Sequence, residues 1–156
     1  MKIKYSKSKP IREEEFEFFS QELGSNFSEK LKQFFINFNG SKPQDNVFKI
    51  SHDNECGIDE FIPFSKILEE RKYLYYVDSK VIPIAWAEGG NYIVVDLDNC
   101  ESVYFWDHEE PQRLVKLATD IYEFLSEIKP FNLKEFVLKE GQVKSGWINP
   151  ELLKKN

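Results

Sequence analysis

The stretch that decides the fold is VIPIAWAEGGNYIVVDLDNCESVYFWDHEE, residues 81–110. It contains three short runs rich in β-branched and aromatic residues: VIPIAWA (81–87), YIVVDL (92–97) and SVYFWD (102–107). Such runs are typical of strands, and the connections between them, EGGN (88–91) and DNCE (98–101), have turn-forming compositions. Strands joined by short turns pair with their neighbours, so the stretch predicts an antiparallel β-meander.

Helical patterns flank this meander. Residues 12–23 place phenylalanine and leucine at helical spacing, with acidic residues in the first turn, where the helix dipole favours them. Ser28 is suited to cap a second helix, which ends where Gly40 can adopt a left-handed conformation. Residues 112–128 return to helical periodicity, and Pro130 ends that predicted helix.

The segment between the second helix and the meander is mixed. Residues 46–51 read as a short strand, a polar loop follows, and a short helix is expected from Ser65 to about Lys72. Helices and strands are therefore segregated along the chain. This order predicts an α+β fold, in which an antiparallel β-meander of about four to six strands packs against an N-terminal helix pair and a C-terminal helix.

Length and composition predict one domain. The chain has 156 residues, which suits a single core, and we expect one domain over 1–156 with a core at about 12–130. The extension 131–156 carries an apolar patch, FVL (136–138), a Trp147, and Asn149-Pro150, which suits the start of a last helical turn.

The chain is expected to be cytoplasmic. It has no apolar run long enough to span a membrane, and its charged N-terminus is not followed by the apolar region of a secretory signal. Cys56 and Cys100 lie far apart and form no paired motif, so free thiols are the simpler interpretation.

The net charge of −6 narrows the classes of partner. Phosphate backbones repel such a surface, which argues against a nucleic-acid-binding module. A basic protein would instead be attracted and steered toward it.

The polar residues 107–110, at the end of the third strand-like run, are the first candidate for chemistry. A metal site would combine His108 with His52, Asp53 or Cys56, but the chain has only two histidines and no zinc-ligand spacing. A general acid–base role would require a cleft. We favour a solvated turn in which Asp107 or His108 leads into the helix expected at 112.

The remaining motifs do not indicate a cofactor. Gly89-Gly90 is explained by a hairpin turn, because no phosphate-binding glycine pattern surrounds it. Neither cysteine lies in a known nucleophile signature. We therefore predict no catalytic residues, no metal and no cofactor.

Aromatic residues of the meander allow two interpretations. Trp86, Tyr92, Tyr104 and Trp106 are either packed, under the tail and its Trp147, or partly exposed as a protein-binding patch. We favour packing, because buried aromatic residues are the commoner case.

Five short motifs in a fixed order resemble one known family. They are Asn39-Gly40-Ser41-Lys42-Pro43, Gly57-Ile58 with Phe61-Ile62-Pro63, Ile82-Pro83-Ile84-Ala85 with Gly89-Gly90-Asn91 and Asp96-Leu97, Val103-Tyr104-Phe105-Trp106-Asp107-His108-Glu109, and Leu117-Ala118 with Glu123-Phe124-Leu125. In this order they resemble the SUKH superfamily of Smi/Knr-like domains over about residues 12–130. The usual Leu-Pro before the second helix is Phe27-Ser28 here, and Ser41 replaces a glycine of the first motif.

The resemblance implies a binding function without catalysis. Bacterial domains of this kind look like immunity proteins of polymorphic toxin systems, which block a cognate toxin, often a nuclease, while fungal relatives act as regulatory scaffolds. We therefore expect an immunity protein for a basic nuclease toxin, with a regulatory scaffold as the alternative. An enzyme that uses Asp107 and His108 is a further rival.

We predict that the partner contacts lie on acidic residues near the loops and on a few aromatic anchors. They are Glu55, Asp59, Glu60, Glu88, Asp98, Glu101, Asp107, Glu109 and Glu110, with Trp86, Tyr104 and Trp106 as the anchors.

Overall fold

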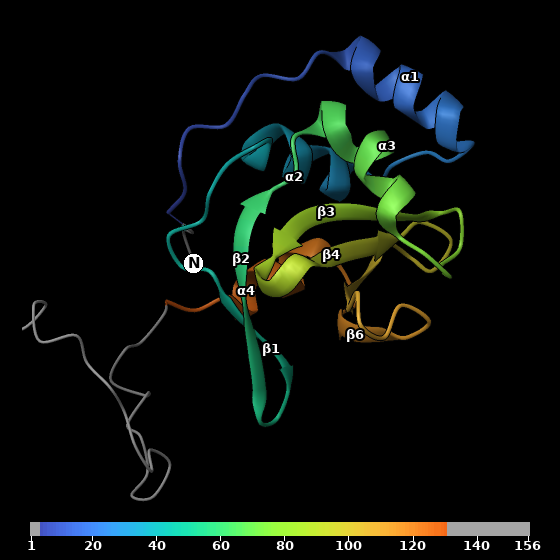
Figure 1. Cartoon of the computed structure of the whole chain (residues 1–156). Coiled ribbons are helices and arrows are strands. Elements are labelled where there is room, and N and C mark those ends of the chain that lie inside the picture. Colours follow the sequence, from blue (N-terminus) through green and yellow to red (C-terminus); the bar gives the residue numbers. More distant parts are fainter. Residues whose placement is uncertain (1–3, 131–156) are drawn as a thin grey trace, which may run out of the picture.

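The computed structural model describes residues 4–130 (Figure 1). The helices are α1 (Glu13–Leu23), α2 (Glu29–Phe38), α3 (Ile67–Glu70) and α4 (Ile121–Glu127), with 3-10 turns η1 (Phe64–Lys66), η2 (Arg71–Tyr73) and η3 (Glu88–Gly90). The strands are β1 (Val47–Ser51), β2 (Asn54–Phe61), β3 (Val81–Ala87), β4 (Asn91–Asp96), β5 (Ser102–Trp106) and β6 (Leu114–Ala118).

The two N-terminal helices form where capping signals and apolar spacing predict them. Gly24 ends α1 in a left-handed conformation with φ +59°, which glycine adopts without steric cost. The Ser28 hydroxyl accepts a hydrogen bond of 3.2 Å from the Leu31 N–H and so caps α2. Gly40, with φ +62°, turns the chain after α2. Both predicted helices are confirmed.

Within the described residues, the six strands form one sheet in the order β1-β2-β3-β4-β5-β6, and every neighbouring pair is antiparallel. This confirms the α+β meander. The first strand also contacts β6, so the sheet curls toward a barrel. Since each strand pairs with the next along the chain, side chains close in sequence become neighbours across the sheet.

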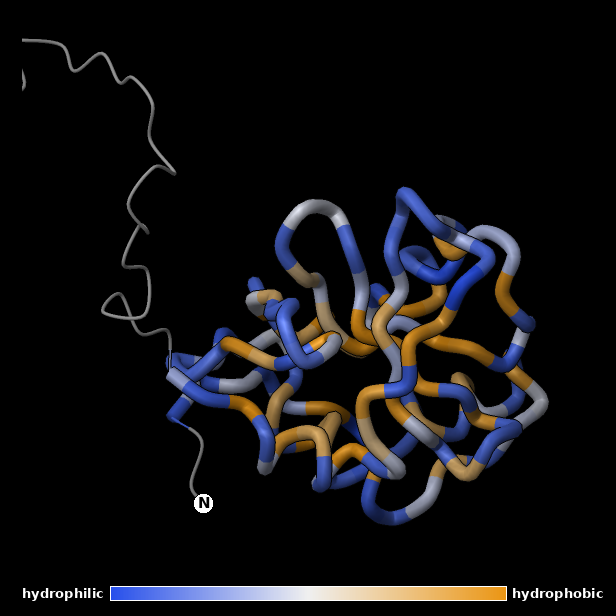
Figure 2. The backbone as a smooth tube through the Cα atoms, turned by 90° about the horizontal axis from the view of Figure 1, so that it is seen from below, coloured by the Kyte–Doolittle hydropathy of each residue, from blue (hydrophilic) through white to orange (hydrophobic). Residues whose placement is uncertain are grey.

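Helices cover both faces of the sheet. On one face, Phe124 of α4 packs against Phe48 of β1, whose ring lies 6.0 Å from that of Phe105 on β5. On the other face, α3 lies over the indole of Trp86 and the phenol of Tyr92. Figure 2 shows hydrophobic segments running through the interior, with hydrophilic residues at the outer turns.

The high phenylalanine content has a structural explanation. Eight phenylalanine rings from α1, α2, β2 and the segments beside them form one continuous cluster of tilted, edge-to-face and stacked contacts. Its centre is Phe64 of η1, which contacts rings from both N-terminal helices and from the segment between them. Such geometry stabilises a core beyond simple area burial, and it joins the helix pair to the sheet.

The prediction of a polar loop after residue 51 is wrong, because residues 54–61 form the strand β2. The polar residues of this segment hide its strand pattern in the sequence. Cys56 and Ile58 point into the core, whereas Glu55 and Asp59 stay exposed on the other side of the strand. The predicted short helix after this segment is confirmed as η1, α3 and η2.

The long helix predicted over 112–128 is also wrong in its first half. Leu114–Ala118 form β6, which pairs with β5, and α4 begins only after Asp120. The Asp120 carboxylate accepts hydrogen bonds from the N–H groups of Tyr122 and Glu123, at 2.8 and 2.9 Å, and so starts the helix. The helix also ends three residues before Pro130, because Lys129 pairs with Val47 beside the sheet.

The features expected in the tail, namely the apolar patch 136–138, Trp147 and the helical turn at Asn149-Pro150, lie outside the described residues. In residues 4–130, no helix is both long enough and apolar enough to cross a membrane.

Candidate functional site: the hairpin rim

Three connections of the meander lie at the same end of the sheet. In an antiparallel meander, alternate connections share an end, so the β1–β2, β3–β4 and β5–β6 turns gather there. We call this end the hairpin rim and define it as residues 51–54, 88–91 and 107–113. The β2–β3 and β4–β5 connections lie at the opposite end.

Side-chain contacts join the three parts of the hairpin rim. The Asn91 carboxamide oxygen accepts from the His108 backbone N–H at 3.2 Å and lies 2.9 Å from its Nδ1. A groove of about 280 Å³ brings Ser51 and Asn54 of the first turn beside Asp107 of the third. The rim is therefore one continuous surface.

The hairpin rim is acidic. Its carboxylates are Asp53, Glu88, Asp107, Glu109 and Glu110. Among these described rim residues, Arg113 is the one lysine or arginine, and it forms an exposed ion pair of 3.4 Å with Glu110. Such an exposed pair contributes little stability, so the surface keeps a net negative charge that can attract a cationic partner.

The Glu88 carboxylate is held in place by the backbone of β2. It accepts a hydrogen bond of 3.1 Å from the Gly57 N–H. A Cβ on Gly57 would lie 2.6 Å from that carboxylate, so glycine is what allows this close approach. Burial, and next the negative charge of Glu88, raise the pKa of Asp59. Glu88 of the rim and Asp59 of β2 therefore lie close enough for their charges to interact.

The predicted acidic contacts divide between the two ends of the sheet. Glu88, Asp107, Glu109 and Glu110 lie in the hairpin rim, with Glu55 and Asp59 on the adjoining strand β2. Glu55 forms an ion pair of 2.5 Å with Lys129, and Glu60, farther along β2, pairs with Lys42 at 3.6 Å.

Asp98 and Glu101 lie at the opposite end, in the β4–β5 turn. The Glu101 carboxylate accepts hydrogen bonds from the Ser28 N–H, at 2.7 Å, and from the Ser28 hydroxyl. It therefore holds the start of α2 against the sheet. Glu101 as a partner contact stays a prediction, at the end of the sheet opposite the hairpin rim.

The aromatic anchors are mostly packed. Trp106 is 2% exposed, and its indole N–H donates to the Pro111 carbonyl at 3.1 Å, so this residue belongs to the core and its prediction as an anchor is wrong. Trp86 and Tyr104 are half-buried. Trp86 and Tyr92 are packed against α3, and the predicted cover by the tail and its Trp147 lies outside the described residues.

A half-buried carboxylate, that of Glu70, holds α3 over this face. One oxygen of Glu70 accepts from the Trp86 indole and from the Tyr92 hydroxyl, each at 2.8 Å. Burial and the Glu70 carboxylate raise the pKa of Tyr92, so its phenol stays protonated and donates. The triad is a structural link between helix and sheet.

The candidate nucleophiles and metal ligands do not assemble into a reactive site. Burial and the charge of Glu88 raise the pKa of Cys56 to about 11, so the thiol is protonated and unreactive at neutral pH. His52 pairs with the adjacent Asp53 at 2.6 Å on an exposed turn. No three histidine, cysteine, aspartate or glutamate side chains gather as a metal site anywhere in residues 4–130.

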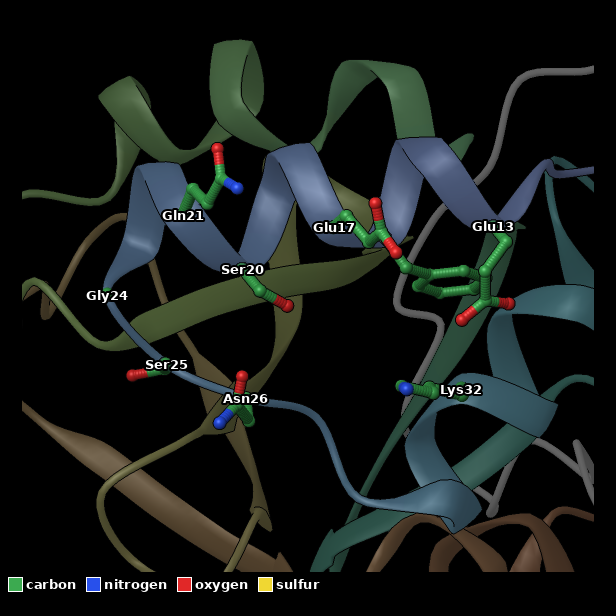
Figure 3. Close-up of a pocket in the computed structure, with 9 residues that line it drawn as sticks. Glu13, Glu17, Ser20, Gln21, Gly24, Ser25, Asn26 and Lys32 are labelled. Atoms are coloured by element: carbon green, nitrogen blue, oxygen red, sulfur yellow. The ribbon is translucent and has the colours of Figure 1, made fainter.

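A separate polar groove runs between α1 and the start of α2 (Figure 3). It holds about 470 Å³, and Glu13, Glu17, Ser20 and Lys32 are among its lining residues. The lining contains serine but neither histidine nor cysteine. Its carboxylates, lysine and amide groups can form hydrogen bonds and ion pairs with a polar ligand.

Sequence reasoning missed three exposed aromatic residues that lie close together in the chain. Tyr73, Tyr75 and Tyr76 follow α3, with 51%, 59% and 77% of their surface exposed. The run YLYY within an otherwise polar segment was the available signal, since exposed tyrosines are common in binding surfaces.

Comparison with known families gives one clear match. The family model described as SMI1 / KNR4 family (SUKH-1) matches residues 10–127, which is more than half of the chain. A search of curated proteins finds no match.

Proposed function

The chain belongs to the SMI1/KNR4 family (SUKH-1), and from this premise we propose that it is an immunity protein of a polymorphic toxin system. It neutralises a cognate toxin by direct binding and performs no catalysis on it. The family is consistent with a protein-binding role of the immunity type. We further propose that the toxin domain is a nuclease with a basic substrate groove.

The observation that carries this proposal is the acidic hairpin rim. Its three turns contain five carboxylates and one arginine or lysine. Nuclease grooves are basic because they bind phosphate, so the rim matches them in charge. Glu88, fixed by the Gly57 N–H, presents its charge in a defined position, which lowers the ordering cost of binding.

The proposed mechanism is occlusion. The hairpin rim covers the substrate groove or active site of the toxin, so that nucleic acid no longer enters. Charge attraction speeds encounter, and the association rate therefore falls as salt rises. Because Cys56 is a protonated thiol and neither histidine nor cysteine lines the α1–α2 groove, the arrangement favours binding over catalysis.

The test uses a toxin domain that the tagged protein captures from its native host. Both proteins are purified, and nuclease activity and binding affinity are measured with the native protein and with Glu88→Lys/Glu109→Lys. The matched control, Glu22→Lys/Glu127→Lys, makes the same change in net charge at exposed helix positions outside the hairpin rim. Circular dichroism confirms the fold of each variant.

We expect the native protein and the control to abolish nuclease activity. The rim variant should bind at least about 100-fold more weakly, since reversing two charges at such an interface costs several kcal/mol. If both double variants bind as the native protein does, the rim is not the interface. If the native protein leaves the toxin active, the immunity proposal itself fails.

A further inference from the structure

Both histidines of the chain, His52 and His108, lie in the hairpin rim. His52 belongs to the β1–β2 turn, and His108 belongs to the connection from β5 to β6. They come to the same end of the sheet because alternate connections of a meander share an end. Histidine is the side chain that ordinarily changes its charge between about pH 5 and 8, so in this range the protons that histidine takes up arrive at the rim.

His108 joins two turns of the rim through Asn91. Its Nδ1 lies 2.9 Å from the Asn91 carboxamide oxygen, and the amide nitrogen of Asn91 donates to the Glu88 carbonyl at 3.0 Å. Because Asn91 offers an acceptor, Nδ1 carries a hydrogen in both the neutral and the charged ring, and the additional proton enters at Nε2. Glu88 directs its own carboxylate at the Gly57 N–H. Protonation of His108 therefore changes the charge of the rim and leaves this contact in place.

Acidic groups surround His108 within its own connection. The Asp107 carboxylate lies 3.8 Å from the His108 Nδ1, and Glu109 and Glu110 follow directly in the chain. Arg113, the cation of this connection, pairs with Glu110 at 3.4 Å. The side chain of His108 is 49% exposed, so a partner that covers these carboxylates would also lie close to the imidazole.

His52 lies at the tip of the β1–β2 hairpin, which projects from the rest of the sheet (Figure 1). Its Nδ1 lies 2.6 Å from the adjacent Asp53 carboxylate. On the flanking strands, Lys49 is exposed and Glu55 pairs with Lys129. The second histidine therefore also stands beside an aspartate on an accessible part of the rim.

Protonation of the two histidines halves the charge of the rim. With neutral imidazoles, five carboxylates and one arginine give the three turns a net charge of −4, which two imidazolium ions reduce to −2. The attraction to a cationic partner falls accordingly, and the new positive charges repel the partner at short range. By linkage, a partner that opposes protonation of the histidines is bound less tightly when they are protonated.

We infer that His52 and His108 make the hairpin rim a pH-dependent binding surface, which holds a basic partner near neutral pH and releases it in acid. This regulation deepens the proposed function and rests on it, because the partner is the proposed basic toxin domain. The release acts through charge, since Asn91 accepts from the His108 Nδ1 in both protonation states.

The test measures the dissociation constant of the toxin domain used above at about pH 8 and about pH 5.5, on either side of the range in which histidine titrates. Four forms of the full chain are compared. They are the native protein, His52→Gln/His108→Gln, His52→Lys/His108→Lys, and the control Gln21→Lys/Asn37→Lys, which adds two positive charges at exposed helix positions outside the rim. The thermal unfolding midpoint at each pH confirms that each form is folded.

We expect the native protein to bind about tenfold more weakly at about pH 5.5 than at about pH 8, because two repelling charges appear at the interface. The glutamine variant should change less than about threefold, since its rim stays uncharged at both positions. The lysine variant should bind weakly at both pH values. The control should follow the native protein, because its added charges lie outside the rim.

An affinity of the native protein that is equal at both pH values would overturn the inference, as would an equal loss in acid for the glutamine variant. Tight binding of the lysine variant at about pH 8, or equally weak binding of the control, would also overturn it. Each of these results leaves the proposed function intact, because the native protein still binds the toxin at about pH 8. Absence of that binding would defeat both proposals, so the two failures are distinct.

Discussion

The two ends of the sheet use the same residue types in different ways. At the end opposite the hairpin rim, charged groups secure helices: Glu101 holds the start of α2, and Lys80 holds the end of α1. Asp120, which caps α4, also pairs with Lys30 of α2 at 2.7 Å. At the hairpin rim, Glu88 is held by a backbone N–H, and Glu109 and Asp107 face solvent beside it.

The role of an acidic side chain near a turn therefore depends on what the fold places beside it. Where the fold brings a helix start or a lysine close, the carboxylate becomes part of the scaffold. Where it brings only other turns, the charge remains available to a partner. Four experiments can test this division.

The largest change in stability is expected when a packed aromatic residue, rather than an exposed one, is replaced by alanine. Trp106→Ala removes a buried indole and its hydrogen bond to Pro111, and it should lower the free energy of unfolding by about 3–5 kcal/mol. Tyr76→Ala should change it by less than about 0.5 kcal/mol, because the side chain is 77% exposed. Urea denaturation of both variants measures the difference. Similar losses in the two variants would contradict the assignment of Trp106 to the core.

The next effect compares a carboxylate from each end. Glu101→Ala should destabilise the protein by about 1–2 kcal/mol, since the Ser28 N–H loses its acceptor at the start of α2. Both Glu101 and its replacement keep the left-handed backbone, φ +55°, so the comparison isolates the side chain.

Glu109→Ala, at the rim, should stay within about 0.5 kcal/mol of the native value. Chemical denaturation at neutral pH checks both variants. Equal stabilities would show that the two ends do not differ in the way described.

A third comparison uses pH. The hydrogen bond and charge of Lys30 lower the pKa of Asp120, so its stabilising contribution is present above the unfolded value of 3.8 and is lost as pH falls through the folded pKa. The pKa shift of Asp59 has the opposite sign. Its pKa is raised by burial and by Glu88, so its contribution is present below 3.8 and is lost as pH rises through the folded pKa.

Asp120→Asn keeps a capping side chain and should lower the thermal midpoint at about pH 7, with the difference shrinking toward about pH 3. Asp59→Asn should leave the midpoint at about pH 7 equal or higher. Thermal melts across this range test both. The opposite pattern would show that the two carboxylates are in environments other than those described.

The fourth comparison is at Gly57, where we expect only a small effect on stability. Its φ is not in the left-handed region, and a new Cβ meets only the carboxylate end of a flexible glutamate, so Gly57→Ala should change the unfolding free energy by less than about 1 kcal/mol. The displaced Glu88 should nevertheless weaken toxin binding several-fold. A binding titration and a thermal melt measure both quantities. A native-like affinity would show that the fixed position of Glu88 is unimportant for the partner.

Local signals in the sequence account for much of the fold. The three strands of residues 81–106 and the two N-terminal helices follow from alternation, turn residues and caps, which act within a few residues. The family resemblance rests on the same segments and is confirmed. These features are short-range, so they are readable without knowledge of the fold.

The prediction missed two strands, β2 and β6, for a physical reason. The leucines and alanine of residues 114–118 fit both a helix and a strand, and pairing with β5 decides between them. The starting signal of α4, Asp120 with Glu123 three residues later, lay inside the predicted helix and would have corrected it. For β2, the exposed Glu55 and Asp59 concealed a buried strand.

The sequence by itself determined the α+β class, the meander, the acidic charge and the family, because each depends on composition or on neighbours along the chain. Only the tertiary structure decided which carboxylates are available. Ser28 and Glu101 are 73 residues apart in the chain and meet through the packing of α2 on the sheet. Glu88 and Gly57, 31 residues apart, meet because β2 pairs with β3. Such partners are set by the three-dimensional arrangement of the elements, which residue type and spacing do not encode.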